Sequence, residues 1–162
     1  MRILISLAFI LCCFCALPGE QTLALIKPNA VEGDHIGEIL SLYEKGGLKI
    51  AALKMTRLSP KEAGSFYQAH KDKPFYLELT RFMSSGPIVA IVLEGDNAVL
   101  KNRELMGATD PKEAKEGTIR AKFGKSLGEN AVHGSDSHIA AEEEIHFFFK
   151  PGEVFKRTSP GT

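Results

Sequence analysis

The feature that most constrains the fold is the alternation of short apolar runs with stretches of helical periodicity. Apolar runs of strand length occupy residues 22–27, 48–58, 87–95 and 145–149. Between them, apolar residues recur at the three- and four-residue spacing of an amphipathic helix. A β-α-β-β-α-β order with additions predicts an α/β (α+β) ferredoxin-like fold. In it, a four-stranded, mostly antiparallel sheet has helices packed on one face.

Local capping signals sharpen the predicted helix boundaries. Residues 59–62 (Ser-Pro-Lys-Glu) match a capping box with proline at the first helical position, where its missing N–H costs nothing. Asp34 is the predicted N-cap of a helix that ends at the glycine pair 46–47. An aspartate or serine at 136–137 is expected to cap a short helix that runs through Glu144.

Composition excludes several classes of function. The 162 residues contain 20 Lys+Arg and 20 Asp+Glu, so net charge gives no reason to expect non-specific binding to nucleic acid or a membrane surface. A hydrophobic content of 44% is enough for one core. Neither G-x-x-x-x-G-K-[ST] nor G-x-G-x-x-G occurs, so a protein that handles phosphates would not use a Walker-type loop.

The N-terminal segment, residues 1–19, differs from the rest. Its apolar run from Ile3 to Leu17 is too short to span a bilayer comfortably but fits the central region of a secretory signal. It lacks an A-x-A cleavage pattern, so it is either an export signal or an extension that the working protein does not need. All three cysteines lie in it, which excludes disulfide and cysteine-metal chemistry from the remaining domain.

His133 is the first candidate for chemistry, although most histidines in a domain are structural or lie on the surface. Gly134 permits a close backbone approach or a positive φ, and Glu144 lies across a short predicted helix, where it could orient the imidazole. The other four histidines offer neither H-x-x-H nor H-E-x-x-H spacing, which argues against a metal site.

Three dispersed cations, Lys27, Arg103 and Arg120, are the second set of candidates. Each is more often a solvated surface charge than a ligand-binding group. Together with an isolated histidine they would suit a polyphosphate substrate, because Arg and Lys bind phosphoryl oxygens. Phosphoryl transfer through a histidine is therefore one hypothesis among several.

Six ordered segments between residues 21 and 149 resemble the nucleoside diphosphate kinase family, and its bacterial members most. The sequence NAVHGSD (130–136) matches the family signature N-x-x-H-G-S-D. The other five segments are TLALIKPNAV, FYQAHKDKPFYLEL, SGPIVAIVLEG, KNRELMGATDP and GTIRAKFG. The resemblance implies a ping-pong transfer of the γ-phosphate from a nucleoside triphosphate to the histidine and then to a nucleoside diphosphate. It also implies a need for Mg²⁺, held mainly by the nucleotide phosphates. An imidazole suits this role, because its ordinary pKa of about 6.5 leaves it largely neutral at pH 7.

The resemblance gives each matched position a role. His133 is the phosphorylated nucleophile, Glu144 and Ser135 orient it, and Tyr67 lies near it. The residues that match phosphate and ribose contacts are Lys27, Arg103, Thr109, Arg120 and Asn130. Phe75 matches the aromatic residue on which the base stacks, an interaction that tolerates any base. Without the resemblance, Phe75 would be a core residue and Ser135 a helix cap. The sequence does not indicate which imidazole nitrogen is phosphorylated.

The chain departs from the family pattern at one position near the first predicted strand. Asn29 stands where the family usually has aspartate. The catalytic domain is predicted to span 20–150, and a short tail, 151–162, favours a homotetramer over a hexamer. Nucleoside tri- and diphosphates are the expected partners, without stable nucleic-acid binding and without a membrane for the mature domain.

The supply of nucleoside triphosphates, which is low outside the cell, favours a location in the cytoplasm, with export through the leader as the alternative. The competing functions are a non-catalytic nucleotide- or nucleic-acid-binding member of the family and a secreted factor.

Overall fold

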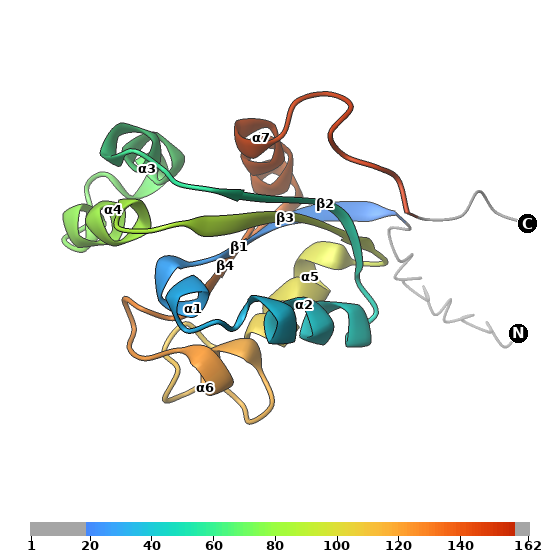
Figure 1. The fold of residues 1–162 in the computed structure, drawn as a ribbon, viewed down its shortest axis with the longest axis horizontal. Coiled ribbons are helices and arrows are strands. Elements are labelled where there is room, and N and C mark those ends of the chain that lie inside the picture. The colour runs from blue at the N-terminus through green and yellow to red at the C-terminus, as the bar shows by residue number, and fades with distance from the viewer. Residues whose placement is uncertain (1–18, 158–162) are drawn as a thin grey trace, which may run out of the picture.

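A four-stranded antiparallel sheet forms the centre of the computed structural model, which describes residues 19–157 (Figure 1). The strands lie in the order β2-β3-β1-β4. Their bounds are β1 (Glu20–Ile26), β2 (Lys49–Thr56), β3 (Ile88–Gly95) and β4 (Val132–Gly134). The ferredoxin-like fold and the strands predicted at 22–27, 48–58 and 87–95 are confirmed. Apart from Gly19, the predicted leader lies outside the described residues.

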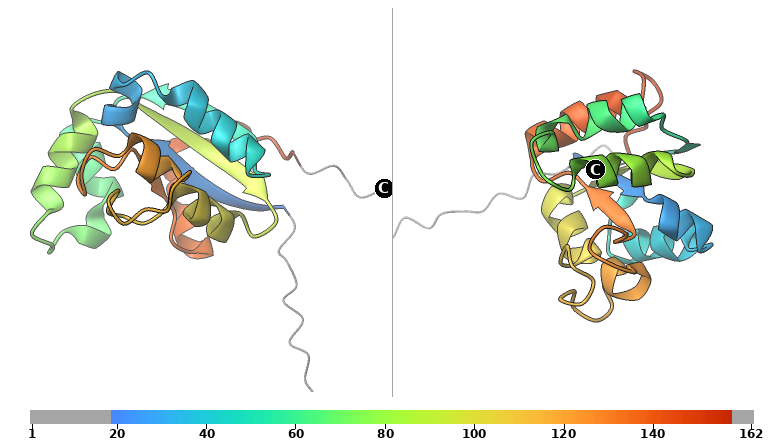
Figure 2. Two further views of the ribbon diagram at one scale, coloured as in Figure 1. Left: turned by 90° about the horizontal axis from the view of Figure 1, so that it is seen from below. Right: turned by 90° about the vertical axis from the view of Figure 1, so that its left-hand side faces the viewer.

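Helices cover both faces of the sheet, so the prediction of helices on one face is wrong (Figures 1 and 2). One face packs against α1 (Pro28–Glu32), α2 (Ile36–Lys45), α5 (Ala98–Met106) and α6 (Ile119–Phe123). The other packs against α3 (Pro60–Phe66), α4 (Tyr76–Ser84) and α7 (His138–Phe148), with a 3-10 turn at Gln68–His70 between α3 and α4. Two separate apolar clusters result, one on each face, and β3 is buried on both sides along nearly its whole length.

The fourth strand is not where the sequence predicted it. Residues 145–149 do not form a strand; they belong largely to α7, which Ser137 caps by accepting a hydrogen bond from the Ala140 N–H. The helix therefore starts as predicted but continues past Glu144. It continues because Ile145 and Phe148, three residues apart, both pack onto the sheet. The strand beside β1 is instead the three-residue β4, which contains His133.

Of the other predicted helix starts, the capping box is confirmed and the Asp34 cap is wrong. The capping box is present, with Ser59 accepting from the Glu62 N–H and Glu62 accepting from the Ser59 N–H. The Asp34 cap is wrong. An unexpected short helix, α1, precedes it, and Asp34 takes the left-handed turn (φ 59°) that joins α1 to α2. His35 occupies the N-cap position instead.

The C-terminal residues follow the outer edge of the sheet. Phe155 donates its backbone N–H to the Ala51 carbonyl of β2 at 2.9 Å, and the Arg157 guanidinium donates to the Ile50 carbonyl at 2.6 Å. The predicted tail thus covers part of the free edge of β2 as far as residue 157. Within 19–157, every helix is too short or too polar to cross a bilayer.

Candidate active site

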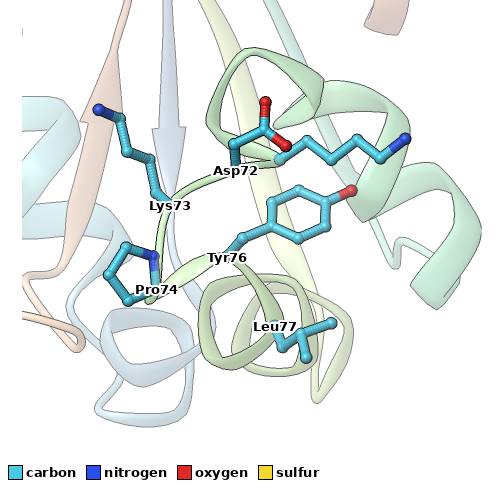
Figure 3. A pocket seen from close by; sticks show the side chains of 6 residues that line it. Asp72, Lys73, Pro74, Tyr76 and Leu77 are labelled. Atoms are coloured by element: carbon cyan, nitrogen blue, oxygen red, sulfur yellow. The ribbon is translucent and has the colours of Figure 1, made fainter.

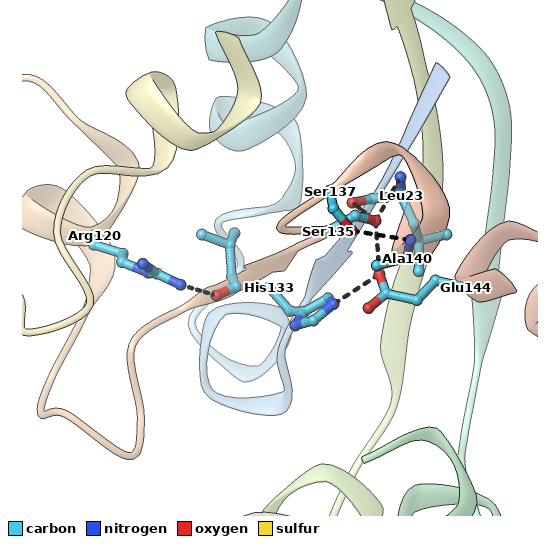
Figure 4. Close-up of polar contacts among 8 residues, drawn as sticks. Leu23, Arg120, His133, Ser135, Ser137, Ala140 and Glu144 are labelled. Atoms are coloured by element: carbon cyan, nitrogen blue, oxygen red, sulfur yellow. Dashed lines mark hydrogen bonds and ion pairs between the residues drawn. The ribbon is translucent and has the colours of Figure 1, made fainter. Parts of the chain in front are cut away.

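His133, Glu144 and Ser135 form a connected hydrogen-bond group (Figure 4). A single carboxylate oxygen, Glu144 Oε2, lies 2.7 Å from Ser135 Oγ and 3.0 Å from His133 Nε2. Ser135 is fully buried and also accepts from the Leu23 N–H at 3.3 Å. Because an ionised carboxylate only accepts, Nε2 carries the hydrogen, and in the neutral imidazole Nδ1 therefore keeps its lone pair. The side chain of His133 is 19% exposed, so the imidazole can still be reached from solvent.

Strand pairing and a close helix contact fix the position of this histidine. His133 pairs with Leu25 of the central strand β1, which ties the loop that precedes β4 to the middle of the sheet. On the opposite side of the strand, any Cβ at Gly134 would overlap with the side chains of Asn102 and Met106 of α5. Gly134 is therefore needed for close backbone approach, one of the two reasons offered from the sequence. Its φ is not positive.

Two aromatic rings stand nearly perpendicular to the imidazole. The Tyr67 ring centroid lies 5.7 Å from that of His133, at an interplanar angle of 90°. The Phe66 ring lies 5.2 Å away at 73°. Tyr67 is only 4% exposed, and its hydroxyl makes no hydrogen bond within residues 19–157. Burial, and then the negative charge of Glu144, raise the pKa of Tyr67 well above its usual value. The predicted proximity of Tyr67 is present, whereas Phe66 was not anticipated.

Lys27 directly follows β1 and is held by an asparagine from the segment before β4. Its Nζ donates to Asn130 Oδ1 at 2.6 Å, and Asn130 Nδ2 donates to the Thr109 carbonyl at 3.0 Å. Three residues predicted to contact nucleotide are therefore linked to one another. Lys27 is 6% exposed, and burial, followed by the charge of Arg120, lowers its pKa to about 7. An anion that binds beside Lys27 would stabilise the charged form of its side chain.

The two arginines have different surroundings. Arg120 is 8% exposed and donates to the carbonyls of Gly107 and Val132, both at 3.1 Å, while its Nε is unpaired within the described residues. Burial is the main reason that the pKa of Arg120 is lowered, and the charge of Arg103 contributes. Arg103, on α5, is exposed. Arg120 thus lies within electrostatic reach of both Lys27 and Arg103, which is consistent with the polyphosphate hypothesis.

A row of rings leads from the histidine to Phe75. Tyr67 stacks on His70 at 6.3 Å between centroids, and His70 lies 5.8 Å from Phe75. Phe75 is 49% exposed, at the start of α4. Its ring is thus available for stacking rather than buried in the core, which was the alternative reading from sequence alone.

A pocket of about 610 Å³ lies on the segment that joins α3 to α4 (Figure 3). Its lining residues are Lys71, Asp72, Lys73, Pro74, Tyr76 and Leu77. None of the residues predicted to act on or bind a nucleotide lines it, so the polar constellation around His133, and not this pocket, is the candidate site. The described residues contain no cluster of three or more His, Cys, Asp or Glu side chains that could hold a metal ion.

Asn29 shows what the departure from aspartate does. It is 3% exposed, and its Nδ2 donates to the Glu129 carbonyl at 3.1 Å, beside Asn130. A carboxylate could not make this donation. This contact holds the segment before β4 against α1.

Comparison with known proteins agrees with this geometry. The sequence profile described as nucleoside diphosphate kinase matches residues 20–154. Nucleoside diphosphate kinase 1 of Protochlamydia amoebophila is 60% identical over 141 residues, which cover 87% of this chain and all of the relative. The nucleoside diphosphate kinase of Chlamydia muridarum is 61% identical over 135 residues, covering 83% of this chain and 96% of the relative.

Solved structures show the same likeness. The Aquifex aeolicus nucleoside diphosphate kinase superposes with a TM-score of 0.81 at 47% identity, over 83% of this chain and 98% of that one. A halophilic nucleoside diphosphate kinase from Halobacterium salinarum, solved in complex with CDP, gives a TM-score of 0.83 at 40% identity. The superposition covers 88% of this chain and 95% of the halophilic protein's chain.

Proposed function

Since the chain belongs to the nucleoside diphosphate kinase family and transfers terminal phosphates between nucleotides, we propose that His133 is the residue through which it does so. In the first half-reaction, Nδ1 attacks the γ-phosphorus of a nucleoside triphosphate. The bond from that phosphorus to the β–γ bridging oxygen breaks, and the diphosphate leaves. A β-phosphate oxygen of a second diphosphate then attacks the phosphohistidine, which restores the imidazole.

The observation that supports this role best is the hydrogen bond from His133 Nε2 to Glu144. It leaves the Nδ1 lone pair free for attack and places a negative charge beside the imidazole, which becomes positive once Nδ1 is phosphorylated. Ser135 steadies the same carboxylate oxygen. We assign both residues an orienting role, by the logic of a nucleophile whose ring is fixed from its far side.

The cations stabilise charge on the transferring group. A loose phosphoryl transition state spreads negative charge over its oxygens and needs little from a protein beyond positioning and charge neutralisation. Arg103 and Arg120 supply fixed charges, and Lys27 becomes fully charged when a phosphate arrives beside its buried ammonium. Thr109 and Asn130 complete the proposed phosphate and ribose contacts, and Phe75 stacks on the base. The CDP bound to the halophilic relative supports a nucleotide as the ligand.

Magnesium enters as part of the substrate. The side chains proposed to contact the phosphates, those of Lys27, Arg103, Arg120 and Asn130, are cationic or amide groups, and no metal-binding cluster occurs among residues 19–157. Hard divalent cations prefer carboxylate, carbonyl and phosphate oxygens. The donor set here therefore fits a Mg²⁺–nucleotide complex that carries its own metal ion and not a resident metal site.

A chase experiment tests the proposal. The full chain is incubated with Mg²⁺ and ATP labelled on its γ-phosphate, separated from nucleotide, and then given unlabelled GDP. We expect acid-labile label on the protein, followed by its transfer to GTP. A protein that binds nucleotide but takes up no label would be the non-catalytic alternative and would contradict the proposal.

The family resemblance also leads to expectations about the bounds of the active domain and the location of the protein. We propose that residues 20–150 are sufficient for activity and that the protein works in the cytoplasm. A chain that starts at Gly19 should match the full-length chain in melting temperature and phosphate exchange, and loss of either would place the boundary elsewhere. Fractionation of the native cell tests the location.

We also propose a homo-oligomer, with a tetramer as the favoured form. The edge strand β2 exposes Leu53 (51%) and Met55 (58%). An exposed apolar sheet edge is normally covered in a stable protein. Sedimentation equilibrium measures the number of subunits, and a monomer at micromolar concentration would contradict this expectation.

A further inference from the structure

We propose that Phe66 is a positioning residue for the nucleophile, and that it holds the His133 imidazole in its attacking orientation with support from Phe147 and Phe148. The inference rests on the proposed role of His133 and adds a residue to it. Phe66 belongs to none of the hydrogen-bond groups of the site, and its sequence signal is limited to its place beside Tyr67 at the start of the family-like segment FYQAHKDKPFYLEL.

One hydrogen bond does not fix an imidazole ring. The bond from Nε2 to Glu144 fixes one corner, and the ring can still rock about the line that joins the two atoms, which moves Nδ1. In-line attack on phosphorus requires Nδ1 to point at the substrate within narrow limits. A second restraint on the ring plane is therefore needed, and flat side chains packed against the imidazole provide one.

Phe66 supplies that restraint within a group of mutually packed rings. Its centroid lies 5.2 Å from that of His133, at 73°, an arrangement that aromatic pairs favour. On its other sides it packs against Phe147 at 5.3 Å and 63°, and against Phe148 at 5.2 Å and 60°. Tyr67 packs on it at 4.8 Å and 89°. Phe66 cannot turn without displacing these neighbours.

The supporting rings come from the helix that also bears the orienting carboxylate. Glu144, Phe147 and Phe148 occupy positions i, i+3 and i+4 of α7, so they share one helix face. Phe66 is the last residue of α3. A single rigid helix thus holds the imidazole twice, directly through Glu144 and indirectly through Phe66.

Phe82 provides a matched control. It lies on α4 and, like Phe66, is a partly buried member of the apolar cluster on this face of the sheet. Among the described residues it makes no ring contact with His133 or with any other aromatic residue of the group. Phe66→Leu and Phe82→Leu remove the same atoms from the same cluster, but only the first removes the flat surface against the imidazole.

The experiment is rapid-quench phosphorylation of the full chain by Mg²⁺ and γ-labelled ATP, with ATP varied. For Phe66→Leu we expect the maximal rate of His133 labelling to fall about three- to tenfold. The ATP concentration that gives half of that rate should stay within about twofold of the wild-type value. Phe82→Leu should label at the wild-type rate, and Phe66→Tyr, which keeps the ring, should restore most of the loss.

Three results would overturn the inference: equal labelling rates in Phe66→Leu and Phe82→Leu, a change confined to the half-saturating ATP concentration, or no recovery in Phe66→Tyr. If Phe66→Leu does not fold, Phe147→Leu replaces it. Phe147 is 40% exposed and supports Phe66 from outside, so the variant should slow labelling about twofold, and a wild-type rate counts against the inference. Failure of the wild-type protein to label would refute the proposed role of His133 itself, which separates the two conclusions.

Discussion

The two halves of the candidate active site differ in how completely the chain builds them before any ligand arrives. Around His133, Ser135 and Tyr67 are buried, Glu144 and Phe66 are partly buried, and these side chains contact one another or the imidazole. Among the residues proposed to contact the nucleotide, Arg103, Thr109 and Phe75 are exposed. The proposed reaction half is thus preorganised, whereas we expect a bound nucleotide to complete the other half.

Lys27 and Arg120 lie at the boundary between these halves and show the cost of preorganisation. Both cations are held in a buried position, with the pKa of each lowered mainly by burial. Each is anchored by carbonyl or amide oxygens and not by a carboxylate. A buried cation without a counter-ion destabilises the folded protein and is available to an anionic ligand.

The largest expected effect is the loss of the nucleophile. His133→Ala should lower phosphate exchange by at least about 10⁴-fold and abolish covalent labelling. Nucleotide binding should persist, because the exposed half of the site is untouched. His138→Ala, an exposed histidine at the start of α7, is the control and should be fully active. Covalent labelling of His133→Ala would contradict the assignment of His133 as the nucleophile, and with it the division of the site into a reaction half and a nucleotide half.

The arginines should give equal kinetic losses but unequal losses of stability. Arg103→Ala and Arg120→Ala are each expected to lower kcat by about 10³-fold, the scale of a charge clamp in phosphoryl transfer. Only Arg120→Ala should also lower Tm, because Arg120 anchors the Gly107 and Val132 carbonyls. Arg57→Ala, an exposed arginine between β2 and α3, serves as the control. An unchanged kcat in both variants would place these arginines outside the site.

Removing the hydroxyl that steadies the carboxylate should have a smaller effect. Ser135→Ala is expected to lower turnover about tenfold and to cost about 1–2 kcal/mol, since it leaves the buried Leu23 N–H with one acceptor fewer. Ser137→Ala removes the cap of α7 at a similar cost in stability. If both variants lose the same activity, the effect of Ser135 is structural and not orienting.

The last expected effect is a pH dependence of stability. Between pH 7 and 10.5, the unfolded chain binds a proton at Lys27 that the folded chain does not, because the folded pKa is about 7 and the ordinary value is 10.5. This site therefore makes the free energy of unfolding rise with pH, by at most about 1.4 kcal/mol per pH unit. Lys27→Met should lose that slope and be more stable than wild type near pH 7. Urea unfolding from pH 7 to 10 measures both, and parallel curves would contradict the burial of the charge.

The sequence predicted most of the fold and missed the parts that depend on tertiary packing. Three strands and the capping box at 59–62 follow from local patterns. The unbroken apolar run of β3 already indicated a strand buried on both faces, so the one-face arrangement was an error of interpretation. The aromatic run 145–149 has the composition of a strand, but the cap at Ser137 and packing of Phe148 keep it helical. The three-residue β4 is too short to show any period.

Some features of the candidate site could also be predicted from the sequence, whereas others depended on tertiary structure. The signature around His133 and the positions of its cations were visible along the chain. The free Nδ1, the link from Lys27 to Asn130 and the contact from Phe66 required geometry, since each joins residues that lie far apart in sequence. Asn130 and Thr109 were found only through resemblance to a family, because their types and spacing indicate no chemistry by themselves.

The most direct test of the preorganised half is the identity of the phosphorylated atom. The protein is phosphorylated with Mg²⁺ and ATP, denatured in alkali to preserve phosphohistidine, and studied by ³¹P–¹⁵N correlation NMR with ¹⁵N-labelled histidine. Because Nε2 donates to Glu144 and leaves the lone pair on Nδ1, we predict one phosphohistidine, at His133, with phosphorus bonded to Nδ1. Phosphorus on Nε2, or on any other histidine, would contradict the orientation that Glu144, Ser135 and the aromatic rings impose.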